Sequence, residues 1–208
     1  MIAQAAVIAV VAVAVAALVA AELDRRRAGA VMAKTVASAG FLLLALLGAR
    51  LANPYDRWVV VALVACLVGD ALLAIPRAFP AGLASFLVGH LGYVAAFSTV
   101  LAPRAWPPLV AAVLVVPGVA ASVWLWPHRG RVRAPVLAYI AVITFMTWGA
   151  FSVAGRAGWI TCAAGVLFYI SDLAVARDRF VLRRFASRAW GLPAYYLAQV
   201  LFALTLGR

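Results

Sequence analysis

The chain has 208 residues, of which 68% are hydrophobic and 12% are charged, and its mean hydropathy is +1.08. Soluble domains are about half apolar and about a quarter charged, so this composition excludes an ordinary soluble domain. Apolar runs of about 20 residues recur along the chain, and the two-residue alternation of membrane β-strands does not occur. We therefore predict an all-α, polytopic transmembrane bundle.

The formal net charge is +12, from 18 Lys and Arg against 6 Asp and Glu. In a soluble protein this excess would indicate a nucleic-acid partner. Here the basic residues separate the hydrophobic runs, which is typical of residues that set membrane topology and face anionic lipid. We expect membrane lipids and no nucleic acid as partners, while the oligomeric state stays open. Cys66 and Cys162 lie inside predicted spans at no metal-ligand spacing, so we interpret them as small apolar residues without a disulfide.

Charged residues and clusters of Pro and Gly divide the chain into eight predicted spans. These are Ile2–Ala21, Val31–Ala49, Arg57–Ile75, Ala81–Leu101, Trp106–Trp126, Ala134–Val153, Gly158–Ala176 and Trp190–Leu206. The loops between them are short, which predicts one integral membrane domain over residues 1–208. The first span lacks the basic start of a signal peptide and is followed by Arg25, Arg26 and Arg27, so we expect it to remain in the mature protein.

The arginines are divided unequally between alternate loops. The first, third, fifth and seventh loops hold 12 of them, whereas the other loops and the C-terminal segment hold 5. The positive-inside rule then places the odd loops in the cytoplasm and both termini outside. Because the Ala-, Arg- and Val-rich composition is typical of a high-GC bacterial genome, we expect this membrane to be the bacterial inner membrane.

Two of the six acidic residues lie inside spans. The other four are at span ends or in loops, where we expect a solvated surface: Glu22, Asp24, Asp56 and Asp178. Asp70 and Asp172 come five and four residues before the cytoplasmic ends of the third and seventh spans. At about 1.5 Å per residue, both carboxyls should lie roughly 6–8 Å inside the membrane boundary. Ionisable groups within a span are functional by default, so this pair is our candidate catalytic site.

Further polar residues fall near the same layer of the predicted bundle, with His90 and Gln199 deeper at mid-span, and each has a structural interpretation beside the functional one. Lys34 would reach the interface as a snorkelling side chain, the tyrosines would form an interfacial belt, and the histidine and glutamine would hydrogen-bond neighbouring helices. As a set they are candidate substrate-binding residues: Lys34, His90, Tyr139, Tyr195, Tyr196 and Gln199.

Two neighbouring carboxyls in a low-dielectric layer do not both ionise easily, although Lys34 could hold one as the anion. One protonated and one ionised carboxyl suit general acid and base catalysis, and equally the proton relay of a transporter with water-filled access from both sides. A third reading is an interaction protein in which the aspartates only pair with Lys34 and the tyrosines. The two histidines, His90 and His128, lack a metal-ligand spacing, so we predict no metal and no cofactor.

Four segments carry a resemblance to a known family. They are GDALLAIPRAFPAGLASFLVGHLGYVAAF, AYIAVITFMTWGAF, GVLFYISDLAVARDRF and AYYLAQVL, and in this order they resemble the motifs of the lysoplasmalogenase (YhhN-like) family. The resemblance implies an eight-helix membrane hydrolase that cleaves the vinyl-ether bond of lysoplasmalogens to a fatty aldehyde and a glycerophospho-alcohol. It places the family's paired aspartates on Asp70 and Asp172 and its polar companions on the substrate-binding candidates.

Hydrolysis of a vinyl ether needs an acid that protonates the β-carbon, then a base for water and a negative charge near the oxocarbenium ion. Asp70 and Asp172 supply these roles, and the sequence does not decide which residue plays which. A lysolipid keeps its head group at the interface, so Arg77 or Arg179 at the rim would meet the phosphate, unless both serve topology alone.

Overall fold

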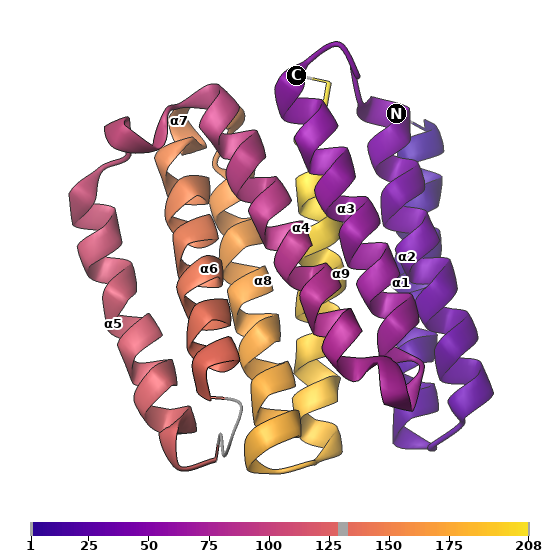
Figure 1. Cartoon of the computed structure of the whole chain (residues 1–208). Helices are drawn as coiled ribbons and strands as arrows, with labels where there is room; N and C mark the ends of the chain where they lie inside the picture. The colour runs from indigo at the N-terminus through magenta and orange to yellow at the C-terminus, as the bar shows by residue number, and fades with distance from the viewer. Residues whose placement is uncertain (1, 129–132, 208) are drawn as a thin grey trace.

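The computed structural model describes residues 2–128 and 133–207, and these form a bundle of helices without strands (Figure 1). The long helices are α1 (Ile2–Leu23), α2 (Arg27–Gly48), α3 (Pro54–Leu73), α4 (Phe79–Val100), α5 (Pro108–Leu125), α6 (Arg133–Ser152), α8 (Ile160–Ala176) and α9 (Phe185–Ala203). A short helix, α7 (Ala154–Ala157), and three 3₁₀ turns lie between them. Each predicted span corresponds to one long helix, which confirms the all-α polytopic bundle.

Among the described residues, five helices have the length and apolar composition needed to cross a membrane: α1, α2, α4, α5 and the stretch Ile160–Val181. Large apolar side chains are exposed on the outside of the bundle, for example Val13 at 70% and Val116 at 68%. In water such a surface would be unfavourable, whereas in a bilayer it contacts lipid chains. The exposed apolar belt is therefore the lipid-facing surface of an integral membrane protein.

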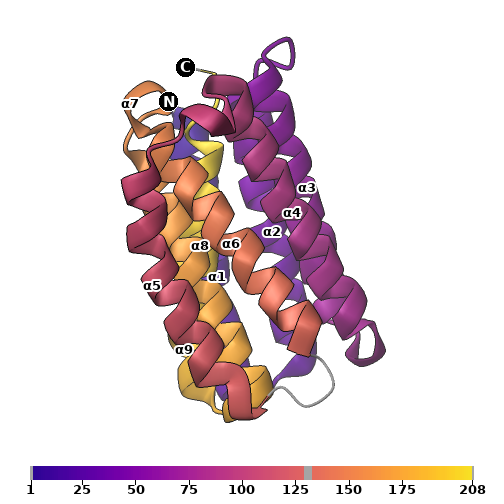
Figure 2. The ribbon, with the colours of Figure 1, turned by 60° about the vertical axis from the view of Figure 1, so that its left-hand side comes forward.

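The arrangement of the helices is clear in two views. Helix α9 lies between the α1–α2 hairpin and α8, α3 pairs with α4, and α5 stands at the edge, mainly against α6 (Figures 1 and 2). Both termini lie at one end of the bundle, and the α1–α2, α3–α4 and α8–α9 connections lie at the other. The second end is the one for which the arginine count predicts the cytoplasmic side.

The close approach of α3 and α4 depends on glycines. A Cβ atom on Gly89 would come within 2.8 Å of the Cys66 sulfur, and one on Gly92 within 3.0 Å of the Ala62 Cβ. Only glycine allows two helix backbones this close, as is common between membrane helices. The contact holds α3, which carries Asp70, against α4, which carries His90.

Local sequence explains how α3 begins, and α8 ends unusually. The Asn53 side chain accepts a hydrogen bond from the backbone nitrogen of Tyr55 at 2.9 Å, and Pro54 occupies the first turn of α3. Beyond α8 the chain forms a π-helix, Arg177–Val181, in which the Leu182 nitrogen donates to the Arg177 carbonyl at 2.9 Å. Single π turns occur frequently at functional sites.

The expectation that Asp56 belongs to the solvated surface is wrong. Asp56 is 1% exposed, and its Oδ2 accepts hydrogen bonds from the backbone nitrogens of Arg50 at 2.7 Å and Gly207 at 3.1 Å. Its position in the first turn of α3 suits a carboxylate, because unpaired backbone N–H groups favour negative charge there. Asp56 thus ties the C-terminal turn to the α2–α3 loop.

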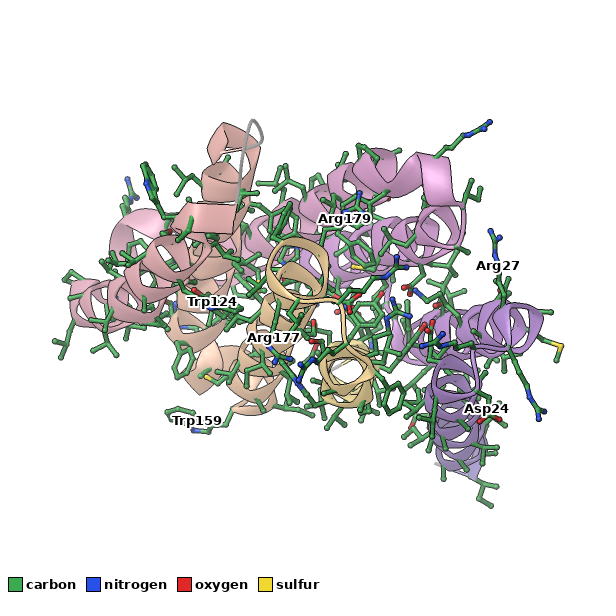
Figure 3. The ribbon with its side chains drawn as sticks, turned by 90° about the horizontal axis from the view of Figure 1, so that it is seen from below. Asp24, Arg27, Trp124, Trp159, Arg177 and Arg179 are labelled. Carbon is green, nitrogen blue, oxygen red and sulfur yellow. The ribbon has the colours of Figure 1, made fainter. Side chains whose placement is uncertain are left out.

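Glu22 and Asp178 are also less solvated than expected. Arg188 on α9 donates to Glu22 Oε2 at 2.6 Å and to Asp178 Oδ2 at 3.2 Å, and the two acidic side chains are 25% and 20% exposed. This ion-pair group joins α1, the π segment and α9. Asp24, exposed at 51% and paired with Arg26 at 3.4 Å, matches the expected solvated surface (Figure 3).

Candidate active site

The two intramembrane aspartates come from α3 and α8, near the end of the bundle that Figure 3 views from below. Asp70 is 3% exposed, and the Asp172 side chain is 11% exposed. Each lies at the centre of its own polar cluster. Among the hydrogen bonds of the described residues, none joins one aspartate to the other, so each carboxyl has partners of its own.

Asp70 accepts hydrogen bonds on Oδ2 from α2 and α9. The Ser38 hydroxyl donates at 2.7 Å and the Tyr195 hydroxyl at 2.8 Å, while the Tyr196 hydroxyl is at 3.5 Å. On the other oxygen, Oδ1, the Lys34 ammonium forms an ion pair at 3.3 Å. Hydroxyl donors and an ammonium around a carboxyl group stabilise a negative charge on its oxygens.

Lys34 and Ser38 reach Asp70 because they lie four residues apart on α2 and therefore share one face. The Lys34 side chain is 18% exposed, so its ammonium lies mostly within the bundle instead of at the interface. Tyr196 also joins this cluster, since its hydroxyl is 3.2 Å from that of Ser38. Ser38 was not among the residues predicted from the sequence, although its spacing from Lys34 was the available signal.

Asp172 contacts His90 on α4 and Tyr139 on α6. The distance from His90 Nε2 to Asp172 Oδ2 is 3.0 Å, and the Tyr139 hydroxyl is 3.5 Å from Oδ1. The other ring nitrogen, Nδ1, lies 2.7 Å from the backbone carbonyl of Phe86. A carbonyl only accepts hydrogen bonds, so Nδ1 must carry a proton.

This tautomer has a chemical consequence. With Nδ1 protonated, the 3.0 Å contact between Nε2 and Asp172 Oδ2 requires one further proton, on either the imidazole or the carboxyl. Asp172 and His90 therefore share one transferable proton. His90 is fully buried, and its ring is fixed by stacking on Phe168 at 4.2 Å between centroids.

Aromatic side chains connect the two clusters. The Tyr195 ring, whose hydroxyl binds Asp70, lies 5.7 Å from the Phe168 ring, and Phe168 stacks on His90. Phe86 makes a second link, since its ring is also 5.7 Å from Tyr195 and its carbonyl orients His90. Such rings exclude water, so the charges of both clusters act in a low-dielectric layer.

Gln199 lies outside both clusters. It is fully buried, and its Oε1 accepts a hydrogen bond from the Tyr93 hydroxyl at 2.6 Å. Tyr93 in turn stacks on Phe202 with centroids 4.0 Å apart, in the aromatic core. The described hydrogen bonds of Gln199 thus lead to Tyr93 and to neither aspartate. Tyr93 was not predicted from the sequence, where it reads as one more aromatic core residue.

The six predicted companions are therefore placed in three groups. Lys34, Tyr195 and Tyr196 contact Asp70, His90 and Tyr139 contact Asp172, and Gln199 bonds to Tyr93. Within residues 2–128 and 133–207, no three His, Cys, Asp or Glu side chains converge as a metal site would require. The candidate site consists of Asp70, contacted by an ammonium and hydroxyl donors, and of the Asp172–His90 pair, whose contact requires a proton on one partner.

Fold and site together define a polytopic helical membrane protein with two buried acid clusters at one end of its bundle. Sequence comparison makes the assignment more specific: the profile of the YhhN family matches residues 29–206, and the chain belongs to this family.

The relatives it resembles include lysoplasmalogenase TMEM86B of Homo sapiens, 34% identical over 151 residues, which are 73% of this chain and 64% of that protein. Lysoplasmalogenase of Mycobacterium bovis is 35% identical over 163 residues, covering 73% of this chain and 60% of that protein. Lysoplasmalogenase TMEM86A of Homo sapiens is 37% identical over 177 residues, covering 79% of this chain and 71% of that protein. The chain thus spans less than two thirds of the length of the first two relatives. No solved structure matches it.

Proposed function

We propose that this chain is a membrane-embedded hydrolase that cleaves the vinyl-ether bond of lysoplasmalogens. The supporting observation is the Asp172–His90 pair, in which Nε2 of His90 lies 3.0 Å from Oδ2 of Asp172 and one proton is shared between them. The anionic Asp70 cluster lies beside this pair. Vinyl-ether hydrolysis requires this combination of a proton donor and a separate negative charge. The names of the relatives, all lysoplasmalogenases, agree with this reaction.

The environments of the two aspartates assign different roles to them. Asp172 delivers the shared proton to the β-carbon of the vinyl ether, and the C=C π electrons form the new C–H bond. The resulting oxocarbenium ion is stabilised by the Asp70 carboxylate. Asp70 is already bound by Lys34 and hydroxyl donors, so it serves as a fixed negative charge and not as the proton carrier.

The second half of the reaction restores the enzyme. Water adds to the cationic carbon and gives its proton to Asp172, which His90 holds in place. The hemiacetal then collapses as its hydroxyl proton passes to the leaving glyceryl oxygen, giving a fatty aldehyde and a glycerophospho-alcohol. The balance is one vinyl ether and one water consumed, with no cofactor required.

The same charges would serve a proton-coupled transporter, which needs water access from both ends. The region between the site and the opposite end contains large side chains that are less than 2% exposed: Phe41, Tyr93, Phe97 and Phe202. This filled core favours the hydrolase over the transporter. We propose that residues 1–208 act as one domain in the bacterial inner membrane. The site then lies near the cytoplasmic face, and its substrate is a lysolipid.

Aldehyde release by purified protein in detergent tests the proposal, with lysoplasmenyl-ethanolamine and -choline as substrates. Asp172→Asn should lower kcat by about 10²–10⁴-fold because it removes the transferable proton. Asp70→Asn should lower kcat by about 10²–10³-fold, the usual cost of losing transition-state electrostatics. Asp24→Asn is the matched control, since Asp24 is exposed and its ion pair is with Arg26, outside both clusters, and it should leave the rate unchanged.

The proposal fails if the unaltered protein releases no aldehyde above background. It fails also if both active-site variants retain the full rate. Thermal unfolding of each variant in the same detergent is the control for folding. A variant whose Tm falls together with its rate has lost folded protein, and its lower rate says nothing of catalysis.

A further inference from the structure

Arg179 differs from its neighbouring arginines at the site end of the bundle. Its guanidinium carbon lies 4.1 Å from the centroid of the Phe79 ring, so it reaches from the π segment after α8 to the start of α4 (Figure 3). Arg177 points elsewhere and donates to Ser187 at 2.9 Å. Arg179 itself has no hydrogen bond or ion pair with the part of the chain that the structure describes.

The π face of the Phe79 ring attracts the charge of the guanidinium above it, while the N–H donors of Arg179 have no hydrogen-bond acceptor among the described residues. Stacking fixes the side chain without using those donors. A fixed, charged and planar donor set matches the geometry of a phosphate, to which Arg binds through two parallel hydrogen bonds. The Phe79–Arg179 pair is therefore a preorganised receptor for an oxyanion.

The Phe79–Arg179 pair lies on the same helix faces as the Asp172–His90 pair, both after α8 and on α4. Arg179 follows Asp172 by seven residues, which is two helical turns and about 10 Å of rise. On α4, Phe79 precedes Phe86 by seven residues and His90 by eleven, spacings that keep all three on one face. The oxyanion receptor thus lies on the same side as Asp172 and His90, displaced toward the end of the bundle.

We propose that Arg179, held over the Phe79 ring, binds the phosphate of the lysolipid head group and so sets the depth of the vinyl ether. The identity of this ligand rests on the proposed function. In an extended lysoplasmalogen, seven bonds of about 1.3–1.6 Å separate phosphorus from the vinyl β-carbon, a span of roughly 8–9 Å. This span matches the rise of about 10 Å between Arg179 and Asp172.

Ligand binding tests the inference without any turnover. The probes are a saturated 1-O-alkyl-glycerophosphocholine, which has no vinyl bond to cleave, and the 1-O-alkylglycerol of the same chain length, each titrated into protein in a maltoside detergent. The unaltered protein should prefer the phosphate-bearing ligand by about 10–100-fold, the usual worth of a charged hydrogen-bonded contact. In Arg179→Gln the ratio of the two affinities should fall to nearly one, while the affinity for the alkylglycerol stays unchanged.

Two further variants sharpen the result. Arg179→Lys keeps the charge but loses the planar fork, so it should restore only part of the preference. Arg183→Gln removes the same charge from an exposed residue nearby and should leave the preference intact. Glycerophosphocholine without a chain should compete weakly, because the chain contributes most of the binding.

Each contrary outcome overturns the inference. A preference that survives in Arg179→Gln means that another group binds the phosphate. Equal weakening of both ligands together with a lower Tm means that Arg179 only ties α8 to α4. Competition by free phosphate as strong as that of the lysolipid means an unspecific anion site. Failure of the hydrolase proposal is seen separately, as retained phosphate preference without aldehyde release.

Discussion

At the residue scale, the surroundings of Asp70 and Asp172 separate two carboxyls that are alike in sequence. Both follow a small residue and both lie near the end of an apolar helix. Asp70 has a lysine and hydroxyl donors around it, which stabilise negative charge, while Asp172 has a histidine with which it shares a proton. The difference arises from neighbours on other helices and is the basis for the different roles of the two aspartates in the proposed mechanism.

Two adjacent tyrosines provide a matched test of this arrangement. The Tyr195 hydroxyl is 2.8 Å from Asp70 Oδ2, whereas the Tyr196 hydroxyl is 3.5 Å away and also lies near Ser38. Tyr195→Phe should reduce kcat about 10-fold, since one good hydrogen bond to a carboxylate is worth roughly 1.5–3 kcal/mol. Tyr196→Phe should reduce kcat less than 3-fold by the same reasoning, because a contact of this length is weak. An equal loss in the two variants, measured as aldehyde release at saturating substrate, would contradict the assigned geometry.

In the proposed mechanism, His90 orients Asp172 and shares its proton. His90→Gln keeps a polar side chain but cannot carry a transferable proton, so kcat should fall about 10²–10⁴-fold. Cys162→Ala, a substitution of a buried residue on α8 outside both clusters, serves as the control for general disturbance of the core.

At the scale of elements, the α3–α4 contact packs the helix that carries Asp70 against the helix that carries His90. It depends on Gly89, where any Cβ atom would press on the Cys66 sulfur. The contact is between two backbones, so neither helix can move aside without shifting its polar residues.

Gly89→Ala should therefore lower the free energy of unfolding by about 1–3 kcal/mol, which is the usual effect of inserting an extra methyl group into a packed core. Gly155→Ala is the matched control, because no atom lies within 4 Å of its Cβ position. The double variant Cys66→Ala, Gly89→Ala should recover part of the loss, since it removes the sulfur in the way. Thermal or denaturant unfolding in detergent measures all three, and equal stability of Gly89→Ala and Gly155→Ala would refute the proposed contact.

At the scale of the whole molecule, the helices set both termini at one end and the two acid clusters toward the other. The arginine-rich loops are concentrated at the cluster end, which the positive-inside rule assigns to the cytoplasm. The head group of a substrate would then be reached from the inner leaflet.

Cysteine labelling in intact cells measures this orientation. In a variant with Cys66 and Cys162 replaced by Ala, Arg104→Cys should react with an impermeant maleimide, because it lies in an even loop. Arg183→Cys, in an odd loop, should react only after the cells are opened. The reverse pattern would place both termini and the even loops in the cytoplasm.

The sequence by itself determined the helical class, the eight long helices and the presence of two acidic residues inside them. These follow from composition and apolar run length, which act locally along the chain. Part of the Asp70 cluster could also be predicted, because Lys34 and Ser38 are four residues apart and therefore share a helix face.

Only the tertiary structure decided which companions belong to which aspartate. It paired His90 with Asp172 and Lys34 with Asp70, buried Asp56 under the C-terminal turn, and directed Gln199 to Tyr93. These pairings join residues 36 to 151 positions apart, as with Lys34 to Asp70 and Asp56 to Gly207. Such contacts depend on how helices face one another across the bundle, and no property of a single helix specifies that.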